Sequence, residues 1–439
     1  MRLRTALLLP LLAGPLAAQQ PTATPVASGP LTLLDAIRIG RERGVAATLA
    51  QLNARVANER IGDRRADLLP NVAGAANYSR QTENLSEFGI TFPGLPEVTD
   101  PFSLWRFRIG ASQTLFDAAA FARLRAARDS AAAAGLDARA VGELAGATAG
   151  LAYLRVLSAR ETVRAREADS VVAATLLDQA RQLVAAGVSP AIDATRSEVS
   201  YGAVRTELEL ARNAVDRTRL DLLRALDLAP SATLELGDSL GLGAIDLPLD
   251  PDEAGRYARE RRAELEAERS RTTAIRRTLT AIKAENLPSV GLSGYYQQSG
   301  TSMDDLSGTY QVQLGVSVPI LDGFRRQSRA REQQSRLDAQ VVRERDLGNQ
   351  VETEARQAVL DVASARQQVA IAGDRLRLAE QELAQADERF RAGVAGSVET
   401  TNAQSAVIAA RDALIQARVN YGTARVSAYR ALGIIDHLQ

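Results

Sequence analysis

The sequence predicts a mainly helical protein, built from two related halves, in which long coiled-coil hairpins accompany four strands suited to a transmembrane β-barrel. Three observations support this fold class. Landmark residues recur in the same order in both halves of the 439-residue chain, apolar residues repeat every seven positions over long stretches, and four segments alternate apolar with polar residues. Only 4% of the residues are aromatic, which favours slender helices over thick globular cores.

The composition argues against several classes of function. The chain has no cysteine and one histidine, His437, so we expect no disulfide framework and no Cys- or His-rich metal site. Its 53 basic residues are balanced by 53 acidic residues, which argues against nucleic-acid binding through a basic surface. The sequence has no glycine-rich phosphate loop, Ser–His–Asp set or metal-ligand spacing. We therefore expect a protein that is not an enzyme and uses no cofactor.

Residues 1–18 have the composition of a secretory signal peptide. Arg2 and Arg4 precede a short apolar run, and small residues follow at Ala17 and Ala18. The apolar run is too short to cross a bilayer, so we expect cleavage and export from the cytoplasm. Because the chain has no cysteine, we expect no lipid anchor on the mature protein.

An internal duplication organises the rest of the chain. Three landmarks occur in both halves: Leu69-Pro70 and Leu287-Pro288, Asp117 and Asp322, Gly187 and Gly393. We therefore divide the chain into a signal peptide (residues 1–18), a first repeat (31–227), a connector rich in proline, glycine and aspartate (228–251) and a second repeat (252–433).

Each repeat is expected to contain the same elements in the same order. A helical segment, residues 33–67 or 252–286, ends at the Leu-Pro pair because proline disfavours helix at the residue before it. Two strands follow. Asp117 or Asp322 is then placed to cap a very long helix, which ends at Gly187 or Gly393 before a returning helix begins.

The long helix of the second repeat has an unbroken heptad pattern. Apolar residues fall seven apart from Val362 to Phe390, and alanines precede them by four residues from Ala358 to Ala386. The returning helix has alanine at every seventh position from Ala403 to Ala431. This pattern predicts a coiled-coil hairpin, and a helix of about 70 residues would be about 100 Å long.

The strand segments have one apolar and one polar face. The clearest runs from Tyr310 to Ile320, and another places Trp105 and Phe107 in alternation with Arg106 and Arg108. Alternation of this kind occurs in transmembrane barrels and also in soluble β-sandwiches. The alternation alone therefore leaves both structures open.

The distribution of aromatic residues favours the membrane barrel. Residues 78–121 and 295–324 contain 12 of the 18 aromatic residues, as girdles at the membrane interface require. We expect the interfacial set to include Trp105, Phe107, Tyr296 and Tyr310. Four strands cannot close a barrel, so the chain must oligomerise, and two, three or four copies remain open on geometry alone.

The duplicated order of helix, Leu-Pro pair, strand pair and long helix, with its glycine turns, resembles the TolC-type outer-membrane efflux protein family. The resemblance covers residues 31–432 and rests on order and spacing rather than on one motif. It implies a homotrimer in which a twelve-stranded barrel in outer-membrane lipid continues as a helical barrel across the periplasm of a bacterial cell. It also implies a passive exit duct of a tripartite efflux or type I secretion system, docked to a periplasmic adaptor and an inner-membrane pump.

The glycine turns lie where the family has its periplasmic tips. Gly187 and Gly393 suit the left-handed residue that ends a helix, and ordinary helix turns explain them fully. The resemblance adds a second interpretation, in which Gly187, Val188, Gly393 and Val394 contact the adaptor.

Acidic residues follow both turns. Asp193 and Glu399 begin the returning helices, where the helix dipole alone favours acids. The resemblance implies a gate at the periplasmic entrance formed by Asp193, Glu399 and Asn402, and rings of carboxylates favour cations. The chain departs from the family's pattern, because Ala395 stands at the basic partner position and Asn402 at the position of an acid. Arg196 or Arg391 could substitute for the missing partner.

A second class of function is kept as an alternative. In it, the chain is a secreted structural tether or a periplasmic adaptor, with helical hairpins and a soluble β-sheet. Adaptors usually carry one hairpin, whereas this sequence predicts two. The sequence does not name the cargo of an exit duct, which could be drugs, metal ions, proteins or polysaccharide.

Overall fold

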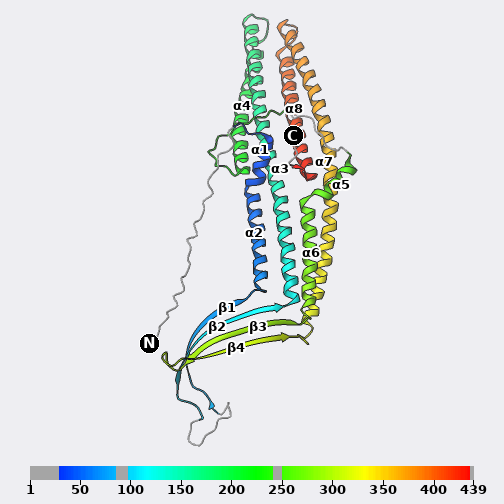
Figure 1. The fold of residues 1–439 in the computed structure, drawn as a ribbon. Helices are drawn as coiled ribbons and strands as arrows, with labels where there is room; N and C mark the ends of the chain where they lie inside the picture. The colour runs from blue at the N-terminus through cyan, green and yellow to red at the C-terminus, as the bar shows by residue number, and fades with distance from the viewer. Residues whose placement is uncertain (1–28, 86–96, 241–249, 436–439) are drawn as a thin grey trace.

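The computed structural model describes residues 29–85, 97–240 and 250–435, and in it the chain is elongated (Figure 1). Two long helical hairpins extend toward one end and the four strands form the other end. The C-terminal helix ends partway along the molecule, beside the helices of its middle part. The predicted signal peptide, residues 1–18, and His437 lie outside the described residues.

The hairpins are made of two helices of 68 and 67 residues and two of 35 residues each. They pair α3 (Ala118–Ala185) with α4 (Ala191–Ala225), and α7 (Arg325–Arg391) with α8 (Ser397–Ala431). At a rise of about 1.5 Å per residue, the longest helix spans about 100 Å. Helices α3 and α8 also lie side by side, so the hairpins of the two repeats are packed together.

Buried alanines confirm the predicted coiled-coil seam. In α7 every alanine at the seven-residue spacing from Ala358 to Ala386 is buried, and Phe390 is 1% exposed. In α8 the alanines at positions 403, 410, 417 and 431 are buried as well. Small side chains at these positions allow α8 to pack closely against the second half of α7.

The predicted first helix of each repeat is in fact two helices. The first repeat has α1 (Leu33–Arg43) and α2 (Val45–Ala66), divided by the extended backbone of Gly44. The second repeat has α5 (Pro251–Arg261) and α6 (Ala263–Ala284). At this second break the buried Arg262 forms ion pairs with Glu264 and Glu354, and it donates to the carbonyl of Ala431 at 3.3 Å.

One of the two predicted helix caps is confirmed. Asp117 Oδ1 accepts from the backbone N–H groups of Ala119 and Ala120, at 2.8 and 3.1 Å. The cap predicted at Asp322 is wrong, because α7 begins after Phe324, which has a left-handed φ of 62°. Asp322 instead accepts hydrogen bonds from the backbone and the guanidinium of Arg326.

The main apolar core lies in the middle of the molecule, where α1, α5 and the ends of α4 and α8 surround α3 and α7. Tyr153 of α3 is fully buried in this core. Its hydroxyl oxygen lies 2.9 Å from both the carbonyl oxygen of Leu31 and the carboxylate of Asp238, so these two acceptors share its single O–H donor. Burial and the Asp238 carboxylate raise the pKa of Tyr153, which keeps the hydroxyl protonated as a donor. The side chain therefore joins α3 to the connector and to the start of α1.

Tyr153→Phe is expected to destabilise the protein by about 1–3 kcal/mol, because it leaves the buried carbonyl of Leu31 and the partly buried carboxylate of Asp238 without this donor. The measurement is the free energy of unfolding in urea, in detergent. Tyr201→Phe, at a partly exposed tyrosine of α4, is the control. Equal unfolding midpoints for the two variants would contradict a structural role for the Tyr153 hydroxyl.

The four strands form one antiparallel sheet in the order β1-β2-β3-β4. They are β1 (Asn71–Gln81), β2 (Phe102–Phe116), β3 (Ser289–Gly300) and β4 (Ser307–Ser317). Pairing of β2 with β3 joins the two repeats in the middle of the sheet. β4 ends earlier than the predicted run to Ile320, since Pro319 cannot donate to a sheet hydrogen bond.

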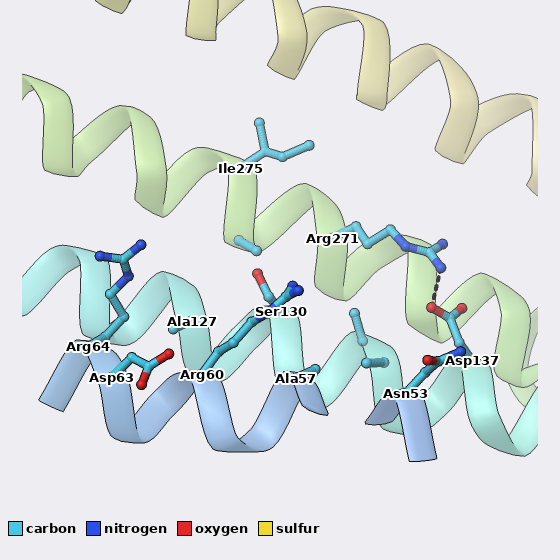
Figure 2. A pocket seen from close by; sticks show the side chains of 13 residues that line it. Asn53, Ala57, Arg60, Asp63, Arg64, Ala127, Ser130, Asp137, Arg271 and Ile275 are labelled. Carbon is cyan, nitrogen blue, oxygen red and sulfur yellow. Dashed lines mark hydrogen bonds and ion pairs between the residues drawn. The ribbon is translucent and has the colours of Figure 1, made fainter. Parts of the chain in front are cut away.

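Between the sheet and the core, α2 and α6 pack against α3. Figure 2 shows a hollow where α2, α3 and α6 meet, lined by small side chains such as Ala57 and Ala127 and by charges of both signs. Arg271 of α6 forms ion pairs with Asp137 of α3 and with Glu268 of its own helix. Opposite charges therefore link the second repeat to the first at this level.

Among the helices of the described ranges, none combines the length and the apolar character needed to cross a bilayer.

Candidate functional site: a two-faced sheet and the helical tips

One face of the sheet is mainly apolar on all four strands. The register pairs Tyr78 with Trp105, Ile109 with Tyr296, and Leu292 with Leu314, so their side chains share a face. The apolar set is Val72, Ala76, Tyr78, Trp105, Phe107, Ile109, Ala111, Phe116, Val290, Leu292, Tyr296, Tyr310, Val312, Leu314 and Val316. No helix of the described chain covers this face (Figure 1), and the four β4 members are between 65% and 80% exposed.

The structure places all four predicted interfacial aromatics on this apolar face. Trp105 and Phe107 lie on β2, and Tyr296 of β3 stands opposite Tyr310 of β4. The ring centroids of Tyr78 and Trp105 are 4.6 Å apart. All of these residues lie in the part of the sheet that is farther from the helices. Their contact with a membrane interface stays a prediction.

The opposite face is polar and hollowed. It carries Asn71, Asn77, Arg106, Arg108, Ser112, Ser293, Tyr295, Gln297, Thr309, Gln311 and Gln313. Two hollows lie on it, and both are lined by Asn71, Ser112, Ser293 and Gln313. The sheet is therefore curved, with its polar face on the concave side.

Both outer strands of the sheet have a free edge. β1 and β4 pair on one side only, and each is 11 residues long. In lipid, unpaired backbone groups along such edges cost several kcal/mol each, so a membrane location requires pairing with further strands.

The structure brings the two predicted tips together at the far end of the hairpins. Gly187 and Gly393 have positive φ angles of 75° and 70°, as predicted for residues that follow a helix. Val188 and Val394 are exposed by 59% and 68%. A Cβ atom on Gly393 would lie 3.5 Å from Val188, so the tips of the two repeats are neighbours. Their contact with an adaptor stays a prediction.

The acids beyond the turns have different surroundings. Asp193 is 5% exposed, and its Oδ1 accepts a 2.6 Å hydrogen bond from the Ser397 hydroxyl of the other hairpin. Glu399 is partly exposed and forms a 3.0 Å ion pair with Arg389. Arg196 comes within 3.9 Å of Asp193. The sequence did not indicate Ser397 or Arg389 as partners, because both contacts depend on how helices approach one another.

Of the two alternative partners, Arg196 lies beside Asp193, whereas Arg391 and Asn402 do not join it. Arg391 pairs with Asp387 of its own helix at 2.7 Å. Asn402 is exposed on α8. The structure therefore joins Asp193 to the second hairpin through Ser397, while the gate formed by Asp193, Glu399 and Asn402 stays a prediction.

A buried charge network farther along the hairpins was not indicated by the sequence. Arg166 and Asp169 of α3 form a 3.0 Å ion pair, and their side chains are 9% and 3% exposed. Arg166 also pairs with Glu207 of α4 at 3.0 Å and with Asp412 of α8 at 2.5 Å. Arg411 of α8 pairs with Asp169. This network connects three helices of the two hairpins.

A duplicated pair of long helical hairpins, joined to an open sheet with one apolar and one concave polar face, defines the protomer of a membrane barrel with a helical extension. The chain belongs to the outer membrane efflux protein family, whose model matches residues 40–227 and 255–434. Membership confirms the predicted family and outer-membrane location, and it confirms that the chain is not an enzyme.

Known proteins agree with this assignment. The chain is 24% identical over 291 residues to the outer membrane efflux protein BepC of Brucella suis biovar 1 (strain 1330), a match that covers 64% of this chain and 61% of that protein. The chain thus spans less than two thirds of the length of this relative.

Solved structures share the fold. The outer-membrane channel OprN matches with a TM-score of 0.78 and 20% identity, over 91% of this chain and 89% of that chain. The CmeC outer membrane channel of Campylobacter jejuni matches with a TM-score of 0.80 and 16% identity, over 92% of this chain and 86% of that chain. At these identities the likeness concerns the fold, and it confirms the predicted class of long helices with four antiparallel strands.

Proposed function

We propose that this protein is a passive exit duct of the outer membrane, part of a tripartite efflux or type I secretion system. The observation that carries the proposal is the uncovered apolar face of the sheet, set at one end of helices about 100 Å long. The apolar face would contact lipid, the concave polar face would line the lumen, and the hairpins would continue the duct through the periplasm.

The assembly that we propose is a homotrimer, as the family implies. The free edges of β1 and β4 can pair with those of neighbouring copies, and three copies of four strands give a closed barrel of twelve. Closure would satisfy the backbone groups at both edges, which lipid requires. The proposed closure uses the same two strands at each of three equivalent interfaces.

The same apolar face disfavours a secreted tether or adaptor with a soluble sheet. In water, an exposed apolar surface of this extent would promote aggregation. The separating experiment is extraction. The duct should remain with the membrane until detergent is added and should run as a heat-resistant oligomer, whereas a protein released by salt washing alone would support the tether.

Docking of a periplasmic adaptor, and through it an inner-membrane pump, is proposed at the paired tips. Val188 and Val394 supply exposed apolar side chains next to one another. A photo-crosslinking residue at either position is expected to capture the adaptor in cells. The same residue at Val171, which is 67% exposed on the side of α3, is the control. Capture at Val171 but not at the tips would contradict docking at this site.

Removing the two acids at the tips is expected to open the proposed entrance. Asp193→Ala removes the acceptor of the Ser397 bond between the hairpins, and Glu399→Ala removes a carboxylate near the tips. The double variant should conduct more than the wild type and lose preference for cations, because carboxylate rings attract cations.

Planar-bilayer recording in a KCl gradient measures both properties. Ser397→Ala is the control, since it removes the interhelical hydrogen bond but keeps both charges. It should raise conductance without changing ion preference. Unchanged conductance and selectivity in the double variant would mean that the two acids serve only the ends of their helices.

A further inference from the structure

The four strands carry an unbalanced set of charges. They contain three arginines, Arg80, Arg106 and Arg108, and no aspartate, glutamate or lysine. All four strands lie within the described ranges, so this count is complete for the sheet. A segment that spans a membrane seldom carries uncompensated charge, because burying it in lipid is costly. The positions of these arginines therefore need an explanation.

The register places two of the arginines on the polar face. Arg106 stands opposite Asn77 on β1 and Ser299 on β3, and Arg108 stands opposite Gln297. The Arg108 guanidinium lies 3.7 Å from the ring centroid of Tyr295, a cation–π contact that holds it over the neighbouring strand. Arg80 falls on the other side, one residue before the end of β1.

The curvature of the sheet makes this face the inner one. Arg108 lines one of the hollows of the polar face, together with Asn71, Gln311 and Gln313. A lipid-facing arginine near the middle of a membrane strand costs about 2–4 kcal/mol, so Arg106 and Arg108 belong in the water-filled lumen. In a closed trimer, symmetry would repeat this pair three times around the lumen.

Within the described residues, neither Arg106 nor Arg108 forms an ion pair. The described acids at this end of the sheet lie in the connecting segments rather than on the strands: Glu83 after β1, Glu97 and Asp100 before β2, and Asp304 and Asp305 between β3 and β4. Arg106 is four residues inside β2, or about 13 Å from its start. That separation exceeds the Debye length of about 10 Å at 0.1 M salt, so the loop acids neutralise the arginines only weakly.

We propose that Arg106 and Arg108 form an anion-selective zone inside the strand region, and that the duct favours anionic solutes there. The ligand class is small anions and the phosphate or carboxylate groups of larger solutes, because guanidinium groups bind such groups with two parallel hydrogen bonds. Rings of arginine favour anions in pores generally. The inference rests on the proposed function, since the zone needs a closed and conducting barrel.

The experiment compares two channels in planar bilayers. One carries Arg106→Gln and Arg108→Gln together, and the other keeps both arginines. Both channels also carry Asp193→Ala and Glu399→Ala, so that the tip acids do not set the selectivity. In this background the chloride-to-potassium permeability ratio should exceed one, and the arginine changes should lower it about threefold or more. Tripolyphosphate added from the strand side should block the arginine-containing channel and not the glutamine variant.

Two matched variants separate charge from structure. Arg80→Gln removes an arginine from the same sheet but from the other side, and it should change neither selectivity nor block. Arg106→Lys with Arg108→Lys should keep the anion preference and weaken the block, because lysine lacks the forked donor geometry. Equal permeability ratios and equal block in the arginine and glutamine channels would overturn the inference alone. Absence of conductance in every form would overturn the proposed duct, and the inference with it.

Discussion

Leu314→Arg is expected to abolish the heat-resistant oligomer, whereas Gln313→Arg, one residue away on β4, is expected to leave it intact. Leu314 lies on the apolar face and is 65% exposed in the single chain. Gln313 lies on the concave polar face and lines both hollows of the sheet. An arginine facing lipid costs about 2–4 kcal/mol per copy near the middle of the bilayer, and a trimer would contain three copies.

The measurement is gel mobility of membrane extracts, with and without heating, combined with the yield of protein from the outer-membrane fraction. Because the two variants introduce the same residue at adjacent positions, general effects of arginine on expression cancel. If the Gln313 variant loses the oligomer and the Leu314 variant keeps it, then Gln313, and not Leu314, would be the residue that faces lipid. Equal behaviour of the two would contradict a lipid-facing apolar surface.

Arg166→Met is expected to destabilise the helical hairpins by about 3 kcal/mol or more, since removing one partner from a buried charge pair leaves the other poorly compensated. The change deletes contacts to Asp169, Glu207 and Asp412 at once, on three different helices. Among the described residues, Asp169, which is 3% exposed, would keep Arg411 as its one ion-pair partner.

A double variant tests whether the charges themselves matter. Replacing the buried pair with apolar residues, Arg166→Met with Asp169→Leu, is expected to recover much of the lost stability, because the desolvation cost disappears with both charges. Arg212→Met, at an exposed ion pair with Glu209 on α4, should cost less than about 1 kcal/mol. The unfolding free energy in urea is the measurement. A similar small effect of Arg166→Met and Arg212→Met would show that the buried network does not hold the hairpins together.

The features that follow from periodic burial could be predicted from the sequence. The heptad alanines of α7 and the alternation in β4 are repeated patterns, and each position in them faces the same surroundings. The glycine turns were predictable for a related reason, because a positive φ at Gly187 and Gly393 is a local backbone requirement. The two faces of the sheet, and the side chains on each, follow directly from these patterns.

The features that depend on distant partners could not be predicted. The helix break at Arg262 is fixed by contacts with Glu354 and Ala431, which lie 92 and 169 positions away. The contact of Asp193 with Ser397 spans 204 positions. Such pairs depend on the rotation and axial shift of one helix against another, and a single sequence contains no signal for either. The candidate gate was therefore located by resemblance, and its partners Ser397 and Arg389 were found only in the structure.

Single-channel recording of the purified oligomer in planar bilayers shows whether a continuous water-filled path runs through the protein. Discrete conductance steps are expected, larger in the Asp193→Ala, Glu399→Ala variant than in the wild type. The Leu314→Arg variant, which should not insert, is the blank. If the wild type and the Asp193→Ala, Glu399→Ala variant both insert as oligomers and neither raises the current above baseline, the assignment of this protein as an exit duct would be contradicted.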